Sequence, residues 1–449
     1  MFLPRALAGQ GIVARALRGS AITALAYAVG QFLRLASNLI LSRLLFPEAF
    51  GLMALVSVVL VGLQMFSDMG LSPAIARSAR GDDTEFLNTA WTLQIGRGVV
   101  LWLGASALAF PVAAFYGAPD LRMLIPVAAF ALVISGFNPT RIETANRHLM
   151  LGRVTALDLS SQTLGIVSMV LLALATGSVW SLVVGSLIGA VTKLALMTVC
   201  LPGQPNQLRW EHAAAQELVH FGKWILLSTV CGFALSQGDR LILGAYLNLE
   251  QLGIYNIGYF LASFPWLLGG AVTMRVMIPL YRDVPPGAKA ANAPRVRRMR
   301  MAMTAGLLGL LAAFALTGVA LVGALYDDRY VAAGAIMVLV ACVQMPAVVG
   351  MTYDQAALAA GDSRAFFWVL LAKACLQTTA FLIGAQTGGL VGALAGQGIA
   401  LVLSHPLIIW LARRHHVWDA RHDLVAGLFV ALAVALALWL NGQAIAALI

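Results

Sequence analysis

Residues 37–53 read SNLILSRLLFPEAFGLM, and residues 239–255, which begin 202 positions later, read DRLILGAYLNLEQLGIY. Both segments contain Leu-Ile-Leu, followed at the same distance by a Glu and, three positions later, by a Gly. Leu-Ile-Leu recurs easily in an apolar chain, whereas the matched Glu and Gly are harder to obtain by accident. We interpret the two segments as equivalent parts of two homologous halves. Membrane proteins built from two repeats usually work around a site where the repeats meet.

Composition places the chain in a bilayer. Of its 449 residues, 60% are hydrophobic and 11% charged, and the mean hydropathy is +0.86. A soluble fold of this composition would expose apolar surface everywhere. We therefore expect an all-α polytopic membrane protein, with about 12–14 transmembrane helices in two pseudo-symmetric six-helix bundles around a central cavity.

Apolar runs of about 20 residues, the length that crosses the hydrocarbon core, divide the sequence into thirteen predicted spans. Their residue ranges are 20–45, 49–70, 86–115, 121–140, 155–177, 178–201, 218–245, 250–281, 300–325, 330–357, 364–386, 388–411 and 423–441. The predicted domains are an N-terminal six-helix bundle, residues 1–201, a C-terminal six-helix bundle, residues 218–411, and an extra C-terminal segment, residues 423–449.

The distribution of Lys and Arg predicts the orientation of the chain. The N-terminus and every second connection are basic or long, whereas the connections between them are short and hold only Arg122 and Arg329 among several acids. Because Lys and Arg accumulate in cytoplasmic loops, we expect a cytoplasmic N-terminus. The net charge of +10 follows from this bias. We expect no nucleic-acid partner, since the sequence has no separate basic domain.

Polar residues recur on one face of the first span. They are spaced three or four positions apart, which places them on one side of a helix, and they are Thr23, Tyr27, Gln31, Arg34, Asn38 and Ser42. Such a stripe predicts a water-filled lumen beside the helix. A polar seam between helices is the alternative that the spacing leaves open.

The seventh span carries a related pattern. Ser228, Gly232, Ser236 and Arg240 are spaced four apart, and Asp239 precedes the last of them. We expect each half to direct one guanidinium, from Arg34 and Arg240, toward a shared cavity. Ionisable residues within spans are costly unless they face water or a partner, which makes three more cations candidates for this cavity: Arg97, Arg275 and Lys373.

An excess of cations in a cavity predicts an anionic substrate, and Arg suits phosphate because its planar fork donates two hydrogen bonds and stays charged. A lipid diphosphate is the natural anion for such a site. Asp239 and Asp68 are the candidates to bind a coupling ion, Na⁺ or H⁺; a permanent ion pair of Asp239 with Arg34 or Arg240 is the alternative. We expect no other cofactor.

Two regions of the sequence resemble bacterial oligosaccharide flippases of the Wzx type, the polysaccharide branch of the multidrug/oligosaccharidyl-lipid/polysaccharide superfamily. The N-terminal region comprises RLASNLILSRLLFPEAFG at residues 34–51 and SDMGLSPAI at residues 67–75. The second comprises GDRLILG at residues 238–244 and LGIYN at residues 252–256. Arg34, Asp239 and Arg240 fall within these motifs.

This resemblance implies export of undecaprenyl-diphosphate-linked oligosaccharide repeat units across the bacterial inner membrane, by alternating access, for exopolysaccharide, capsule or lipopolysaccharide O-antigen synthesis. The partners it implies are the lipid-linked oligosaccharide, membrane lipids, and a glycan polymerase and glycosyltransferases of the same pathway. The C-terminus, which looks shorter than in fourteen-span members, and a His-rich loop depart from the family pattern. They leave the last helices in doubt.

Two other functions compete with export. A cation-coupled multidrug antiporter of the same fold would be expected to have an acidic cavity, and the cations argue against it. A membrane-embedded glycan polymerase would be expected to hold catalytic residues in a large periplasmic loop, and the predicted loops there are short. The sequence contains no HExxH, G-x-S-x-G or GxxxxGK[ST] motif. His415, His416 and His422 are expected to be solvated on a basic loop, with no metal bound.

Overall fold

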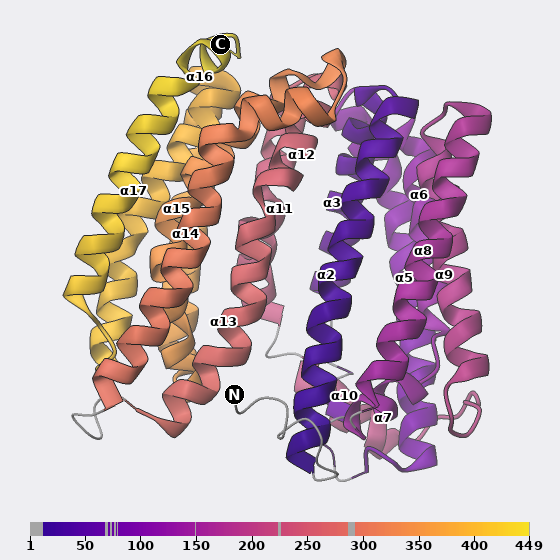
Figure 1. Ribbon diagram of the computed structural model, residues 1–449. Helices are drawn as coiled ribbons and strands as arrows, with labels where there is room; N and C mark the ends of the chain where they lie inside the picture. Colours follow the sequence, from indigo (N-terminus) through magenta and orange to yellow (C-terminus); the bar gives the residue numbers. More distant parts are fainter. Residues whose placement is uncertain are drawn as a thin grey trace. The chain divides into compact units, whose positions relative to one another are not determined.

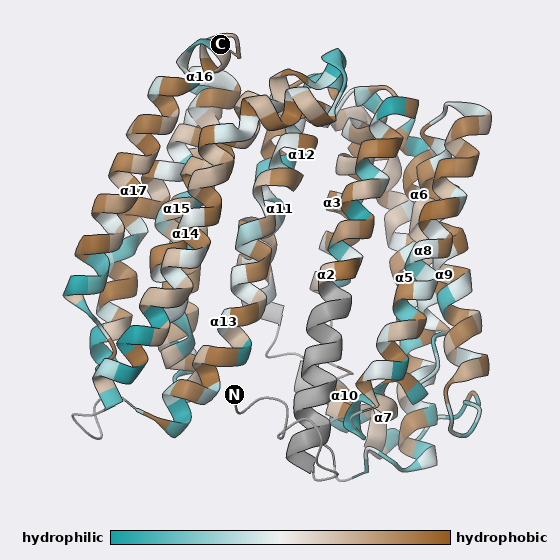
Figure 2. Ribbon diagram, viewed as in Figure 1, coloured by the Kyte–Doolittle hydropathy of each residue, from teal (hydrophilic) through white to brown (hydrophobic). Residues whose placement is uncertain are grey.

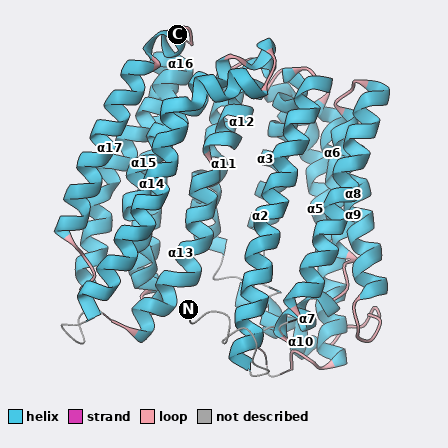
Figure 3. Ribbon diagram, in the orientation of Figure 1, coloured by secondary structure: helices cyan, strands magenta, loops and turns pink. Residues whose placement is uncertain are grey.

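The computed structural model describes residues 12–67, 71, 74–75, 78, 80–148, 150–222, 226–285 and 292–448, and these residues form helices without any strand (Figure 3). Contacts divide the chain into two units, Met1–Val230 and Cys231–Ile449. The helices of the first unit are α2 (Ile12–Leu44), α3 (Pro47–Phe66), α5 (Thr84–Phe115), α6 (Leu121–Gly136), α7 (Arg141–Arg147), α8 (Leu151–Thr176), α9 (Trp180–Cys200) and α10 (His212–Gly222) (Figure 1).

The second unit is built around α15, which packs against every other long helix of that unit except α11. After α11 (Leu226–Tyr246), which begins in the first unit, its elements are α12 (Leu249–Ala262), α13 (Phe264–Asp283), α14 (Asn292–Leu325), the short 3-10 helix η1 (Asp328–Tyr330), α15 (Ala332–Ala359), α16 (Ser363–Arg414), α17 (Ala420–Leu440) and α18 (Gly442–Ala446). Most of α15 is buried, which fits its nearly unbroken apolar sequence.

Across the described part of the chain, helices cover most of each predicted span, and apolar residues dominate their length (Figure 2). The predicted span 218–245 begins in α10 and continues into α11. Within the described residues, eight helices are long and apolar enough to cross a membrane, and ten if two bent pairs each count as one span. Helices α2 and α11, parts of which lie outside the described residues, are not among these, and α16 counts once although it covers two predicted spans. The chain is a multi-pass membrane protein.

Local sequence signals set where several helices begin and bend. Asn248 and Gln251 form a reciprocal capping box at the start of α12. The predicted span 250–281 is two helices bent by 44°, with Pro265 in the first turn of α13. The span 121–140 likewise ends at Gly136, and α7 follows at 60°.

Helix α16 is a hairpin whose two arms touch through glycines. Its backbone leaves helical geometry at Gly388 and Gly389, the first two residues of the predicted span 388–411. Gly389 has a φ of 55°, a conformation that glycine adopts readily. A Cβ added to Gly384 would lie 2.1 Å from the carbonyl oxygen of Gly392. The arms approach this closely because neither residue has a side chain.

The segment between α9 and α11 forms a strap across one end of the first unit, which the sequence analysis did not predict. Ala214 and Leu218 of α10 are buried against a cluster that includes Phe86. Before α10, backbone N–H groups donate to α5 side chains: Gln207 to Asn88 at 2.9 Å, Arg209 to Thr92 at 3.1 Å and Glu211 to Thr89 at 3.0 Å. These bonds satisfy backbone donors that would otherwise be left without partners.

Candidate functional site

Asp239 and Arg240 lie next to each other on α11 but engage different groups of α12. The Tyr255 hydroxyl donates to Asp239 Oδ2 at 2.7 Å. The guanidinium of Arg240 donates from Nε to Asn256 Oδ1 at 3.0 Å and lies 4.7 Å from the centre of the Tyr259 ring. Among the described residues, Asp239 forms no salt bridge; its interaction with Arg240 is therefore not a direct ion pair.

The Asp239 carboxylate is buried, with only 8% of the residue exposed. Its second oxygen, Oδ1, has no hydrogen-bond partner among the described residues. An unpartnered acceptor on a buried carboxylate is costly. The atom is therefore available to a small cation or a proton, as the prediction for Asp239 requires. Asp68, the other candidate, lies outside the described residues.

The polar stripe of α2 presents residues of different exposure. Arg34 is exposed and forms no hydrogen bond or ion pair with the described residues, whereas Gln31 and Asn38 are half-buried. Ser42 is buried and donates to its own helix at Leu39 O. The side chains of Thr23 and Tyr27 lie outside the described part. The stripe is therefore most open at Arg34, and its C-terminal end is packed.

Arg275, like Arg34, forms no ion pair with the described residues. The buried face of α13 is formed at intervals of four by Pro265, Gly269, Thr273, Met277 and Tyr281. Arg275 is exposed on the opposite face, and no ion pair involves it in the part of the chain that the structure covers. Ser236 on α11 is also exposed. Arg34 and Arg275 are thus cations within apolar helices that no carboxylate of the described chain neutralises.

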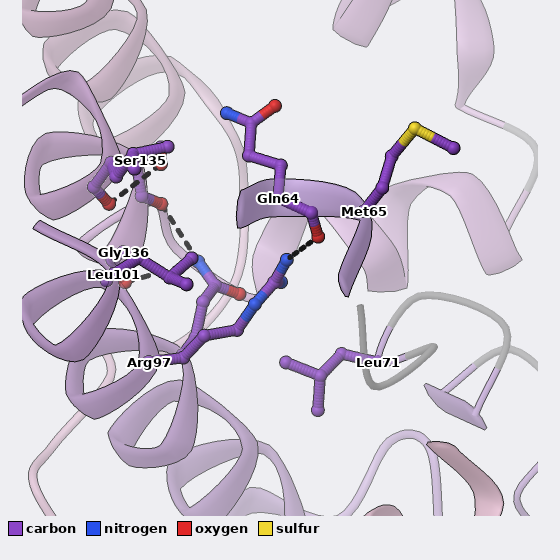
Figure 4. A pocket seen from close by; sticks show the side chains of 10 residues that line it. Gln64, Met65, Leu71, Arg97, Leu101, Ser135 and Gly136 are labelled. Carbon is purple, nitrogen blue, oxygen red and sulfur yellow. Dashed lines mark hydrogen bonds between the residues drawn. The ribbon is translucent and has the colours of Figure 1, made fainter. Parts of the chain in front are cut away.

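Arg97 lies in a pocket of about 460 Å³ between α3, α5 and α6 (Figure 4). Its guanidinium donates from Nε to Ser67 Oγ at 3.0 Å and from Nη2 to Gln64 O at 3.0 Å, at the C-terminal end of α3. Gln94 donates to Ser135 O at the end of α6. Arg97 therefore donates to a carbonyl and a hydroxyl at a helix C-terminus, where a positive charge is favourable.

Lys373 of α16 forms an ion pair with Asp354 of α15, with 3.2 Å between Nζ and Oδ2. Both side chains are at least four-fifths buried. The sequence presented Lys373 as a cavity candidate without this partner, because it does not reveal which way each helix faces. The roles predicted in the cavity for Lys373, Arg97 and the other site residues stay predictions.

One expectation was wrong. Of the three histidines expected to be solvated, only His416 is exposed. His415 has 14% of its side chain exposed and lies 3.4 Å from Asp362 Oδ2. His422 is fully buried, with its ring in contact with Asp423 and Thr304. Arg300, the first residue of the predicted span 300–325, is 1% exposed and donates to the Tyr281 hydroxyl at 2.7 Å. The first turns of α14 and α17 extend the bundle beyond the apolar spans, and this brings Arg300 and His422 into its core.

Charges outside the spans fix the strap. Arg80 donates to both carboxylate oxygens of Glu211, at 2.9 and 2.7 Å, and to Asp83. These hydrogen bonds lower the pKa of Glu211 and of Asp83, and they raise the pKa of Arg80. The three groups therefore stay ionised at neutral pH.

A sequence profile for a family described as "Polysaccharide biosynthesis protein" matches residues 40–334. Among curated proteins, the chain is 24% identical over 361 residues to the succinoglycan biosynthesis transport protein ExoT of Rhizobium meliloti (strain 1021), covering 79% of this chain and 71% of ExoT. It is 21% identical over 410 residues to the lipopolysaccharide biosynthesis protein WzxC of Escherichia coli (strain K12), covering 88% of this chain and 81% of WzxC.

Among solved structures, the lipid II flippase MurJ in an inward closed conformation matches with a TM-score of 0.67 at 10% sequence identity. The match covers 94% of this chain and 99% of MurJ. At this identity the likeness concerns the fold. The predicted all-α membrane fold is confirmed.

Proposed function

Because the chain belongs to the polysaccharide biosynthesis protein family, we propose that it moves undecaprenyl-diphosphate-linked oligosaccharide repeat units across the bacterial inner membrane. The units serve exopolysaccharide, capsule or lipopolysaccharide O-antigen synthesis. Transport proceeds by alternating access, and the N-terminus is cytoplasmic, as the distribution of Lys and Arg predicts. The names of ExoT and WzxC, which describe a transport protein of succinoglycan synthesis and a protein of lipopolysaccharide synthesis, support this assignment.

The observation that carries the proposal is the pair of exposed arginines, Arg34 and Arg275. Arg34 lies ten residues before the end of α2 and Arg275 eight before the end of α13, which is about 15 and 12 Å at the helical rise of about 1.5 Å per residue. A guanidinium at such depth is costly unless it meets water or an anion. A hydrated path that binds an anionic group would solvate or neutralise both guanidinium groups and so remove this cost.

Arg240 adds a guanidinium that is already positioned. Asn256 and the Tyr259 ring hold it, and Gln237 accepts from its Nη1 at 3.3 Å. A preorganised guanidinium loses less entropy when it binds phosphate. Arg34, Arg275 and Arg240 are therefore the proposed diphosphate contacts, and Gln31, Asn38 and Ser236 are proposed to contact the sugar hydroxyls.

Coupling is proposed at Asp239, through its unpartnered Oδ1. Na⁺ takes oxygen ligands and H⁺ takes a carboxylate, so either ion suits this atom. Asp68 stays a second candidate. No other cofactor is invoked.

The alternatives fit the residues less well. A multidrug antiporter for cationic drugs would need acids where this chain has unpaired arginines, and fold likeness at 10% identity does not separate the two classes. A glycan polymerase would need room for a catalytic loop. Instead, the described connections that the charge distribution assigns to the periplasmic side are short, such as residues 45–46, 177–179 and 247–248. Transport is therefore favoured over catalysis, with membrane lipids, a polymerase and glycosyltransferases as proposed partners.

Deletion in the native host tests the function. Lipid-linked repeat units are expected to accumulate on the inner leaflet and surface glycan to disappear, and plasmid-borne Arg34→Ala or Arg240→Ala is expected to fail to restore export although each variant inserts. Arg122→Ala, an exposed arginine outside the helix interiors, is the matched control and should restore it. Normal export by both site variants would remove these arginines from the mechanism. Unchanged lipid-linked units with altered drug sensitivity would favour the antiporter.

A further inference from the structure

A buried carboxylate lies in the first turn of α17. Its two oxygens share four hydrogen bonds: Asp423 Oδ1 accepts from the Tyr353 hydroxyl at 2.7 Å and lies 3.0 Å from His422 Nδ1. Oδ2 accepts from Trp418 Nε1 at 2.9 Å and lies 3.3 Å from His405 Nε2. The acceptor sites of the carboxylate are occupied by groups from α15, α16 and α17 and from the loop before α17.

Within the described residues, the ion-pair partners of Asp423 are the two histidines, with no Lys or Arg among them. The nearest permanent cations are committed elsewhere. Arg297 forms an ion pair with Asp419, and Arg300 lies 4.3 Å from the centre of the Tyr353 ring, whose hydroxyl separates it from Asp423. The charge opposite Asp423 therefore depends on whether an imidazole carries a second proton.

His422 is placed so that both of its charge states can be satisfied. Its Nδ1 faces the Asp423 carboxylate, which only accepts, so this nitrogen carries a hydrogen. Its Nε2 lies 3.0 Å from Thr304 Oγ1. The hydroxyl donates to a neutral ring and accepts from a protonated one by rotating, without movement of heavy atoms. The side chain of His405 is 23% exposed, so a proton can reach the cluster from outside through this residue.

Charged and titratable groups surround these histidines on every helix packed against them. They are Tyr281 of α13, Arg297 and Arg300 of α14, Tyr353 and Asp354 of α15, His405 and Arg413 of α16, and Asp423 with its neighbour Asp419 at the start of α17. In the described chain, no three histidine, cysteine or acidic side chains are arranged to hold a metal ion. The cluster offers a place for a proton.

We propose that His405, His422 and Asp423 form a proton-binding site that controls how firmly α17 is held to the second unit. The Asp423 carboxylate is already charged, and a protonated imidazole adds a coulombic attraction to its hydrogen bond with this carboxylate. A proton on the imidazoles therefore tightens the link between His405 on α16 and Asp423 on α17. The tightening develops as the pH falls through the range of about 5 to 8 in which imidazole gains charge.

Beyond its first turn, α17 packs against α14 and α15 mainly with small residues. Large residues along it face outward, and the buried residues after the first turn are Ala426, Ala433 and Ala437. At its far end, Asn441 donates to Ala315 O of α14 at 3.2 Å. Lipid solvates an apolar helix as well as a neighbouring helix does, so polar contacts and close packing of small residues decide the association. The cluster is therefore a large part of what keeps α17 in place.

Histidine ring ¹⁵N spectra of the full-length protein in lipid nanodiscs test proton binding directly and do not depend on a variant folding. His405→Gln and His422→Gln assign the two signals. Both are expected to change from neutral to charged ring shifts between pH 8 and 5, and each substitution is expected to alter the titration of the remaining histidine. His416→Asn, an exposed residue with a φ of 53° that Asn tolerates, should leave both unchanged.

Amide hydrogen exchange in the first turn of α17, corrected for the intrinsic pH dependence, tests the consequence. Exchange is expected to be about fivefold slower at pH 6 than at pH 8, the factor that corresponds to the upper end of what partly exposed ion pairs contribute. This difference should disappear in Asp423→Asn. Neutral spectra for both rings down to pH 5, or exchange that is equal at the two pH values in the unmodified protein, would overturn the proposal.

Discussion

Replacing Tyr255 with Phe removes the one hydroxyl that contacts the Asp239 carboxylate in the described residues. Because Oδ1 already has no partner there, both oxygens of a buried carboxylate would be left unsatisfied. A hydrogen bond to a charged group contributes about 1.5–3 kcal/mol. The variant is therefore expected to lose that much stability, roughly a ten- to hundredfold change in the unfolding equilibrium.

Thermal unfolding of purified variants in detergent measures this loss, which corresponds to roughly 3–10 °C for a domain of about 200 residues. Tyr259→Phe is the matched control, because it keeps the ring beside Arg240 and takes no donor from Asp239. In an Asp239→Asn background, where no charge is left unsatisfied, Tyr255→Phe should cost much less. An equal loss in both backgrounds, or none in either, would refute the coupling between these two side chains.

Two further predictions concern packing and pH. Gly258→Ala should destabilise the second unit by about 1–3 kcal/mol in the same unfolding assay, because its Cβ would lie 2.7 Å from Ala333 O, whereas Gly270→Ala, with open space around it, should be neutral. Since Arg80 lowers the pKa of Glu211 from 4.5, the strap should hold at neutral pH and loosen as the pH falls below that value. Pepsin cleavage within residues 201–211 should rise there. Glu211→Gln cannot form the ion pair, so its cleavage should not show the part of the pH dependence that comes from this pair. Equal cleavage of the two proteins at every pH would contradict it.

The apolar periodicity was enough to predict the helices, because a span must be apolar over its full length to be stable in lipid. The predicted boundary between the spans 364–386 and 388–411 lies next to Gly388 and Gly389, where the backbone of α16 breaks. The periodicity did not predict the strap, because its order comes from α5 side chains such as Asn88 and Thr89, which lie more than a hundred residues earlier.

For the candidate site, the sequence identified the residue types but not their partners. Lys373 and Asp354 were both recognised as charges within spans, yet their ion pair depends on how α15 and α16 are rotated. His422 was expected on the surface because its neighbours in sequence are basic. In three dimensions it packs against Tyr353 and Thr304, and no local pattern encodes contacts between residues so far apart.

The close approach within α16 affects how variation among relatives should be interpreted. At Gly384, Gly392 and Gly396, any larger residue would collide with main-chain atoms of the opposite arm. If an alignment shows that these positions never vary, the cause is the space between two backbones. Such invariance would carry no information about which glycan is moved, and a search for specificity-determining positions should leave these three out.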